Sequence, residues 1–235
     1  MTLILAITAS DGIVMASDGQ ITIGEVRIPG KKIHRLNDRS AWAAAGEMAL
    51  IQRVQERIGT LPTDLALVNL RDQIGHIVKQ CVTELMQLDF RTQFLPLDQD
   101  RLLQLHFADF IFAEFPKKPE MLHVSVQGSP EWIQDRPFAA GSGDLFAYAL
   151  LQKYQGQNLD LKRAAILAYK VIEETIEVGA YGLGPPIDVW QITPEGVKNL
   201  SEAETASLAE AAHSLREKEI QLLILGNDAS GEKIN

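Results

Sequence analysis

Residues 2–24 read TLILAITASDGIVMASDGQITIG and begin with two short apolar runs around a polar turn. The runs LILAITA and IVMAS flank Asp11-Gly12. An Asp-Gly pair in this place is a strong hairpin signal, because Gly accepts the positive φ of tight primed turns. The pattern therefore predicts a strand pair that starts directly after Thr2. A chain terminus is normally the loosest part of a domain unless something holds it in place. The hydroxyl residue Thr2, directly before such an early strand, therefore reflects either the ordinary composition of strands or a function of the terminus itself.

The composition of the 235 residues is typical of a globular protein with a sizeable core, at 46% hydrophobic and 23% charged. A net charge of -9 argues against nucleic-acid binding, which needs clustered Lys and Arg. The single cysteine, Cys81, excludes an internal disulfide, and its predicted helix favours a buried structural thiol over a nucleophile. No apolar run approaches the roughly 18 residues of a membrane span, so we expect a cytoplasmic protein that binds no membrane.

The rest of the chain predicts blocks of strands that alternate with pairs of helices. Thr63 is the predicted N-cap of the second helix, and the sequence LLIL at 222–225 is a possible last short strand. Further strands are expected at residues 31–36, 41–45, 106–115, 121–127 and 187–192, helices at 47–58, 63–88, from 145, 161–178 and 201–219, and irregular chain at 89–101 and 227–235. This order favours a layered α+β domain over a doubly wound sheet.

Three common chemistries lack their motifs. The five histidines are scattered without paired His or Cys at ligand spacing, so we expect no metal and no cofactor. Gly30-Lys31-Lys32 lacks the glycine-rich stretch of a phosphate-binding loop. A serine-hydrolase elbow needs Gly two residues to either side of its Ser, and around Ser142 those positions are Ala140 and Asp144.

The N-terminus offers a different nucleophile. A free α-amino group titrates near 8, so after removal of Met1 the residue Thr2 would carry both a hydroxyl and a general base. The predicted hairpin returns Asp18 alongside Thr2, and Lys32 begins a later strand. A buried Lys would keep the amine neutral, and a carboxylate would hold the Lys in place. The residues alone leave open that Asp18 is a turn residue and that Lys31-Lys32 is a solvated edge.

At these positions the sequence resembles proteasome β subunits. The similar stretches are Thr2-Leu3-Ile4, Asp11–Asp18, Ser17–Gly24 (especially similar to the bacterial homologue HslV), Lys31–Leu36, Ala45-Gly46-Glu47, Gly141-Ser142-Gly143 and Ile187-Asp188-Val189. Each is weak alone, but the ordered set covers about residues 2–192 and is specific. The stretch at 88–102 and the chain after about residue 200 are longer than in compact members, which favours one of the less-studied bacterial proteasome homologues.

The resemblance implies roles for four catalytic residues. Thr2 would be the nucleophile with its amine as base, Lys32 would tune that amine, Asp18 would be the carboxylate partner of Lys32, and Ser142 would supply a hydroxyl near the terminus. The substrate-binding residues implied are Ile21, Ala41, Ala43 and Ala45. The backbone N–H of Ala43 would stand where the family has an oxyanion-stabilising glycine.

One loop departs from the family. Proteasome β subunits carry an Asp and a Ser after the penultimate helix, where this chain has Ala180 and Leu183. The polar side chains that this loop gives to the catalytic site in the family are therefore expected to be absent, unless Glu177 or Tyr181 takes their place. The departure puts activity in question more than family membership.

The resemblance also implies the fold and the assembly. The fold would be the four-layer αββα sandwich of N-terminal nucleophile hydrolases, with the proteasome-like domain at residues 1–200 and a C-terminal helix and tail at 201–235. The function would be that of a self-compartmentalising threonine-type endopeptidase acting on peptides or unfolded proteins. The assembly would be a homo-oligomeric double ring of twelve or fourteen subunits, with an ATP-dependent unfoldase as a further partner. An N-terminal nucleophile amidase acting on a small amide and a catalytically silent ring subunit are the alternatives.

Overall fold

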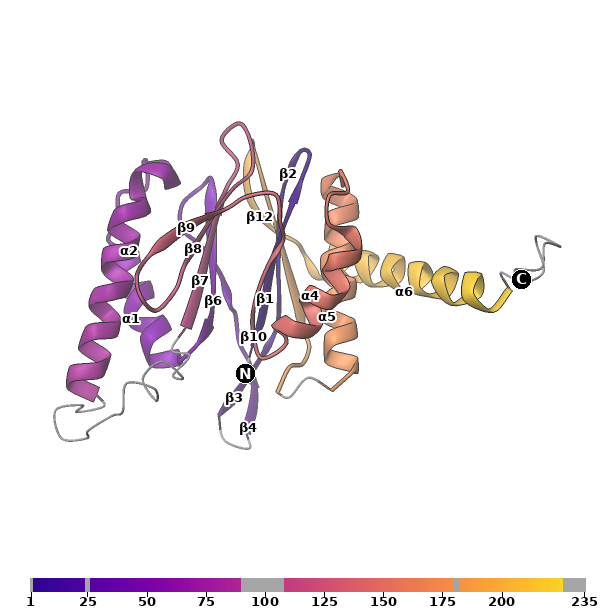
Figure 1. Cartoon of the computed structure of the whole chain (residues 1–235), viewed down its shortest axis with the longest axis horizontal. Coiled ribbons are helices and arrows are strands. Elements are labelled where there is room, and N and C mark those ends of the chain that lie inside the picture. The colour runs from indigo at the N-terminus through magenta and orange to yellow at the C-terminus, as the bar shows by residue number, and fades with distance from the viewer. Residues whose placement is uncertain (1, 24–25, 90–107, 180–181, 226–235) are drawn as a thin grey trace, which may run out of the picture.

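A computed structural model describes residues 2–23, 26–89, 108–179 and 182–225. Two five-stranded sheets pack face to face, and helices cover the outer face of each (Figure 1). The strand orders are β10-β1-β2-β11-β12 in the first sheet and β5-β6-β7-β8-β9 in the second. The predicted α+β class and four-layer sandwich are confirmed.

The first sheet holds the start of the chain in its interior. Its strands, all paired antiparallel, are β1 (Leu3–Ala9), β2 (Gly12–Asp18), β10 (Phe138–Gly141), β11 (Ile187–Thr193) and β12 (Gly196–Asn199). Strand β1 lies between β10 and β2, with Leu3 opposite Gly141 and Ile4 opposite Ser17. The strand that follows Thr2 is therefore hydrogen-bonded on both sides, which explains how the terminus is fixed.

The second sheet and a separate hairpin complete the strands. The second sheet contains β5 (Ile33–Arg35), β6 (Ser40–Gly46), β7 (Ala108–Glu114), β8 (Glu120–Val124) and β9 (Pro130–Ile133). The two-stranded pair β3 (Gln20–Ile23) and β4 (Val26–Pro29) extends beyond the end of the sandwich at which the chain begins (Figure 1). The sequence patterns missed β3, β4, β9, β10 and β12, all of which are four residues long.

The period-two alternation of strands divides the apolar side chains between two sides of each sheet. On β1, Ile4 and Ala6 face the core between the sheets, whereas Leu3 and Leu5 face the core beneath α5. Both sides of the strand are buried, and for this reason its sequence is a continuous apolar run rather than an alternating one.

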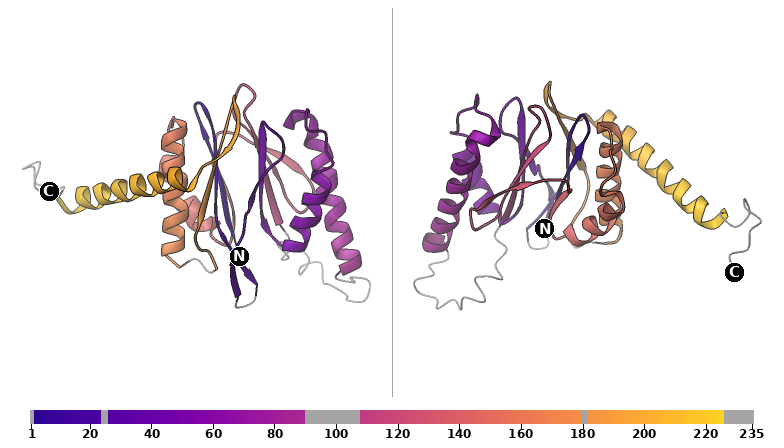
Figure 2. Two further views of the ribbon diagram at one scale, coloured as in Figure 1. Left: turned by 180° about the vertical axis from the view of Figure 1, so that it is seen from behind. Right: turned by 45° about the horizontal axis from the view of Figure 1, so that its top comes forward.

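Two groups of helices form the outer layers. The second sheet is covered by α1 (Met48–Ile58) and α2 (Leu67–Glu84), the latter followed by a π-helical turn at Leu85–Asp89. The first sheet is covered by α4 (Asp144–Leu151) and α5 (Leu161–Glu177), and α6 (Glu202–Leu225) packs on α5 before it extends away from the body (Figure 2). Among the described residues, no helix has both the length and the hydropathy to cross a membrane.

Two local predictions were wrong. Helix α2 begins at Leu67 rather than at Thr63, because the buried carboxylate of Glu114 on β7 accepts a hydrogen bond from the Leu67 backbone nitrogen at 2.6 Å. The sequence LLIL is the end of α6 rather than a strand. Its apolar side chains up to Ile224 are exposed, so sheet packing does not determine its conformation. The tail at 227–235 and most of the irregular stretch at 89–101 lie outside the described residues.

Candidate functional site

The carboxylate of Asp18 lies at the centre of the site. Asp18 ends β2 and is fully buried. Its Oδ1 accepts hydrogen bonds from the backbone nitrogen of Leu3 at 2.8 Å and from Lys32 Nζ at 2.5 Å. Its Oδ2 accepts from the backbone nitrogens of Gln20 and Gly184, both at 3.3 Å. A buried charge needs such partners, and Asp18 connects four separate segments of the chain.

Lys32 is held beside this carboxylate in a poorly solvated place. It precedes β5, and its side chain is 5% exposed. Burial lowers the pKa of Lys32 because desolvation penalises the ammonium ion, while the charge of Asp18 and the hydrogen bond to it oppose that shift. Lys32 is therefore held beside Asp18 as an ion pair, in a poorly solvated site where an additional positive charge would be unfavourable.

The Gly-Ser-Gly turn contacts Thr2 directly. The Thr2 nitrogen donates to Ser142 Oγ at 3.3 Å, and that hydroxyl donates to the Thr2 carbonyl oxygen at 3.3 Å. Gly141 has a φ of 107°, and a Cβ added there would lie 2.0 Å from the Thr2 carbonyl oxygen. Position 141 therefore requires glycine, both for its backbone conformation and for its close approach to Thr2.

An open cleft of about 700 Å³ begins at Thr2 and Lys32. One wall is formed by Ile21 and Ile28 of the β3–β4 hairpin. The remaining lining residues are Lys31, His34, Ala44, Gly46, Glu47, Met48, Ile51, Gln52 and Gln55. The lining of the cleft mixes apolar side chains with polar and charged ones, so it offers an organic ligand both apolar contact and hydrogen-bonding groups.

Of the four residues that the resemblance implies for substrate binding, only one has its side chain in the cleft. Ile21 lines the cleft. The side chains of Ala41, Ala43 and Ala45 belong to the core between the sheets, because these alternate positions of β6 face the first sheet. From this strand, Ala44 and Gly46 line the cleft instead. The role of the Ala43 backbone N–H as an oxyanion donor remains a prediction.

The loop after α5 supports Asp18 through its backbone. Gly184 donates its peptide nitrogen to the carboxylate, and Gln20 Nε2 donates to the carbonyl of Gly182 at 3.0 Å. Leu183 is buried in the core that also contains Leu3. Sequence reasoning missed the Gly184 contact, and the glycine-rich stretch GAYGLGPP was the only signal for it.

Two possible substitutes for the missing Asp and Ser were considered in this loop. Glu177 forms an ion pair with Arg216 of α6 at 2.5 Å and is therefore engaged with another helix. Tyr181, like Ala180, lies outside the described residues. Within the described chain, no group of three or more His, Cys, Asp or Glu residues could hold a metal ion.

His34 contributes a half-buried ring to the cleft. It stacks on Trp42, with ring centroids 4.7 Å apart and an interplanar angle of 28°. Burial, and secondarily the charge of Lys31, lower the pKa of His34 below its ordinary value. Its imidazole is therefore neutral at neutral pH.

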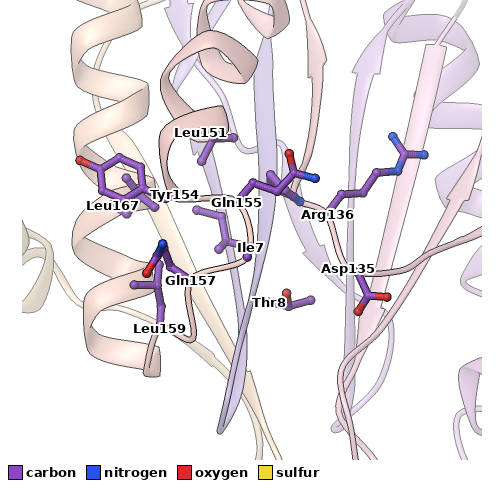
Figure 3. A pocket seen from close by; sticks show the side chains of 12 residues that line it. Ile7, Thr8, Asp135, Arg136, Leu151, Tyr154, Gln155, Gln157, Leu159 and Leu167 are labelled. Atoms are coloured by element: carbon purple, nitrogen blue, oxygen red, sulfur yellow. The ribbon is translucent and has the colours of Figure 1, made fainter.

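Other hollows lie away from Thr2. A pocket beside Ile7 and Thr8 at the opposite end of β1 holds only about 50 Å³, which is too small for an organic ligand (Figure 3). A larger cleft of about 940 Å³ lies between α5, the start of α6 and Pro185-Pro186. It shares Lys31 with the Thr2 cleft, but neither Thr2 nor Lys32 lines it. Of these three hollows, only the Thr2 cleft is lined by both Thr2 and Lys32.

Comparisons with known proteins show similarity to proteasome subunits. A family model described as "Proteasome subunit" matches residues 2–63. "Proteasome subunit beta 2" of Pyrococcus abyssi is 26% identical over 88% of this chain and 94% of its own length. "Proteasome subunit beta 1" of Thermococcus gammatolerans is 25% identical over 85% of this chain and 92% of its own.

A solved structure supports the fold. Anbu (ancestral beta-subunit) from Yersinia bercovieri has a TM-score of 0.73 and 16% identity, and the match covers 99% of this chain and 100% of that one. The class of protein is therefore that of the N-terminal nucleophile hydrolase fold. Within it, the chain is related to the proteasome β subunits, which confirms the relationship predicted from the motifs.

Proposed function

We propose that this chain is a self-compartmentalising threonine-type endopeptidase whose nucleophile is Thr2 after removal of Met1. One observation carries the proposal: the same oxygen of Asp18 accepts from Lys32 Nζ and from the backbone nitrogen that follows Thr2. The lysine is thereby held next to Thr2, at the end of an open cleft. Asp18, Lys32 and Ser142 are the proposed partners of Thr2.

The proposed reaction uses the free amine of Thr2 as its base. The amine takes the proton of Oγ as Oγ attacks the carbonyl carbon of the scissile peptide bond, and an ester with the acyl half of the substrate results. The same amine returns the proton to the departing nitrogen, and water then hydrolyses the ester. The Lys32 charge favours the neutral, basic form of the nearby amine. The Ser142 hydroxyl orients the amine, and backbone N–H groups stabilise the oxyanion.

The proposal includes the assembly and its setting. We expect a homo-oligomeric double ring of twelve or fourteen subunits in the cytoplasm, because an enclosed chamber would restrict access to the cleft. Peptides or unfolded proteins would be the substrates, and an ATP-dependent unfoldase would deliver the latter. The names of the relatives describe subunits, which supports an assembly. The domain at 1–200 would form the sandwich, with residues 201–235 added to it through the contact of α6 with α5.

A catalytically silent subunit is the second candidate, and one observation favours it. Leu183 occupies the position of a polar family residue and is buried among apolar side chains, so its side chain gives Thr2 no polar support. The backbone contact of Gly184 to Asp18 argues for the active form, because the carboxylate is still fully hydrogen-bonded.

Covalent labelling tests the proposal. Intact mass of the purified protein should show loss of Met1, and a peptide epoxyketone should add once, on the N-terminal peptide. Thr2→Ala is the matched control and should take no label. An adduct on Ser142 or Cys81 would overturn the mechanism. A processed but unlabelled Thr2 would favour the silent subunit, and labelling without cleavage of any peptide would favour the amidase.

A further inference from the structure

The side chain of Gln20 connects β3 to the loop after α5. Gln20 is the first residue of β3, and its backbone nitrogen donates to Oδ2 of Asp18 at 3.3 Å. Its side-chain Nε2 donates to the carbonyl oxygen of Gly182 at 3.0 Å, across 162 positions of the chain. One residue therefore contacts both the buried carboxylate and the loop from which Gly184 donates to the same carboxylate oxygen.

Gly184 packs directly against the amide of Gln20. A Cβ added at position 184 would lie 2.3 Å from Gln20 Oε1 and 3.0 Å from its Cδ, so the two residues leave no space for a side chain there. The amide of Gln20 thus binds the loop at Gly182 and packs against it two positions later, at the residue that reaches Asp18.

The loop needs such a contact because its own backbone is permissive. Gly182 has a φ of 76°, and with Gly184 it places a glycine on either side of Leu183. Glycines lose more conformational entropy on ordering than other residues, so the loop has to be held by its surroundings. The nitrogen of Gly19 also donates to the carbonyl of Gly184 at 3.0 Å, which brings the two segments together.

We infer that Gln20 is a positioning residue, whose side-chain amide holds the 182–184 loop so that the nitrogen of Gly184 points at Asp18. The inference rests on the proposed function, in which Asp18 holds Lys32 next to the nucleophile. Gln20 is not among the described residues that line the Thr2 cleft. It therefore acts on the reaction through Asp18 and not by contact with the substrate.

Hydrogen–deuterium exchange measured by mass spectrometry tests the geometry without an assay of activity. Gln20→Met replaces the amide with a thioether of similar length and removes the donor to Gly182. The Gly184 amide should then exchange about 3- to 10-fold faster, as expected for the loss of one neutral hydrogen bond. The next two residues are prolines and add no amide signal. Gln127→Met, at an exposed position, is the matched control and should exchange as the wild type does.

Peptide turnover separates positioning from substrate binding. In Gln20→Met, kcat should fall by about 10- to 100-fold, because a displaced carboxylate shell misplaces the reacting groups. KM should change by less than about twofold, since Gln20 does not line the cleft. A raised KM with an unchanged kcat would instead indicate a contact with the substrate and would overturn the inference.

Gln20→Glu is a second variant that tests the donor itself. Its ionised carboxylate cannot donate to the carbonyl of Gly182, but a protonated carboxyl group can. The nearby charge of Asp18 favours that protonation. The deficit in turnover relative to the wild type should therefore shrink as the pH falls from about 8 to about 5.5. A side chain that only fills space against Gly184 would give the same deficit at both pH values.

The outcomes distinguish this inference from the proposed function. A wild type that neither labels at Thr2 nor cleaves peptides would overturn the proposed function, and exchange at Gly184 would still report whether Gln20 holds the loop. Unchanged exchange in Gln20→Met, or a deficit of Gln20→Glu that is independent of pH, would overturn the positioning role. Circular dichroism should show that both variants stay folded.

Discussion

The Nζ atom of Lys32 lies 2.5 Å from Oδ1 of Asp18, and both side chains are almost completely buried. Burial lowers the pKa of the lysine, and the charge of the carboxylate and the hydrogen bond to it oppose that shift. The ion pair is thus costly to desolvate and is held next to the residue proposed to react. Such an arrangement is typical of functional sites.

Replacing Lys32 with Ala should reduce peptide turnover by about 10²–10⁴-fold, the usual loss when proton transfer fails. It should also lower the free energy of unfolding by about 3 kcal/mol, because one partner of a buried pair is removed. Steady-state kinetics and urea unfolding give the two quantities. Lys79→Ala, at an exposed position on α2, is the control. Unchanged turnover in a folded Lys32→Ala variant would reject the role assigned to Lys32.

Gly141→Ala should displace Thr2. The added Cβ would lie 2.0 Å from the Thr2 carbonyl oxygen, in addition to the strain of a φ of 107°. Gly156→Ala is a suitable control because Gly156 also has a positive φ, 78°, but has nothing within 4 Å of an added Cβ. We expect Gly156→Ala to cost about 1–2 kcal/mol of stability and to label normally. Gly141→Ala should lose the Thr2 adduct, and equal labelling of both variants would contradict the close approach.

Glu114 should prove to be a remote helix cap. Its Oε2 accepts from the Leu67 nitrogen at 2.6 Å, and the side chain is fully buried. Glu114→Ala should lower the free energy of unfolding by about 2–3 kcal/mol, whereas Glu114→Gln should cost less because an amide oxygen still accepts the bond. Urea denaturation measures both. Equal costs for the two variants would show that the hydrogen bond to Leu67 is not what stabilises α2.

His34 should make the protein less stable in mild acid. Its folded pKa is below the ordinary value of 6.5, so between the two values the unfolded chain binds a proton that the folded chain does not. The free energy of unfolding therefore falls as the pH drops below about 6.5. His34→Phe keeps the stacking on Trp42 and should reduce this fall, measured by urea unfolding at about pH 7 and about pH 5. His76→Gln, at an exposed position, should retain the wild-type pH dependence, and an identical profile for both variants would refute the prediction.

The α+β class and the seven-residue strands β1, β2, β6, β7 and β11 could be predicted because their signals are local, whereas the five strands of four residues were missed. The Asp11-Gly12 turn alone determines that Asp18 returns to the start of the chain, and the pairing of β1 with β2 has this register. The start of α2 could not be predicted, since the group that caps it belongs to Glu114, 47 positions later. Thr63 is a plausible N-cap in the sequence, but the helix does not begin there.

The residues that line the cleft show a second limit of prediction from the sequence. Whether Ala43 or Ala44 faces the cleft depends on which side of β6 the cleft opens, and strand periodicity does not contain that information. The backbone nitrogen of Gly184 was missed for a related reason: peptide groups have the same chemistry at every residue. Only the tertiary arrangement selects one of them.

The hydrogen-bond shell of Asp18 has a consequence for how the chain matures. The nitrogen of Gly184 reaches the carboxylate across 166 positions, and Ser142 reaches Thr2 across 140. Contacts of such separation form late in folding, since the entropy of closing long loops opposes them until much of the core exists. During synthesis, Gly184 leaves the ribosome only after most of the chain. A nascent chain therefore holds an incomplete shell around Asp18, and whatever Thr2 does must wait until the polypeptide is nearly whole.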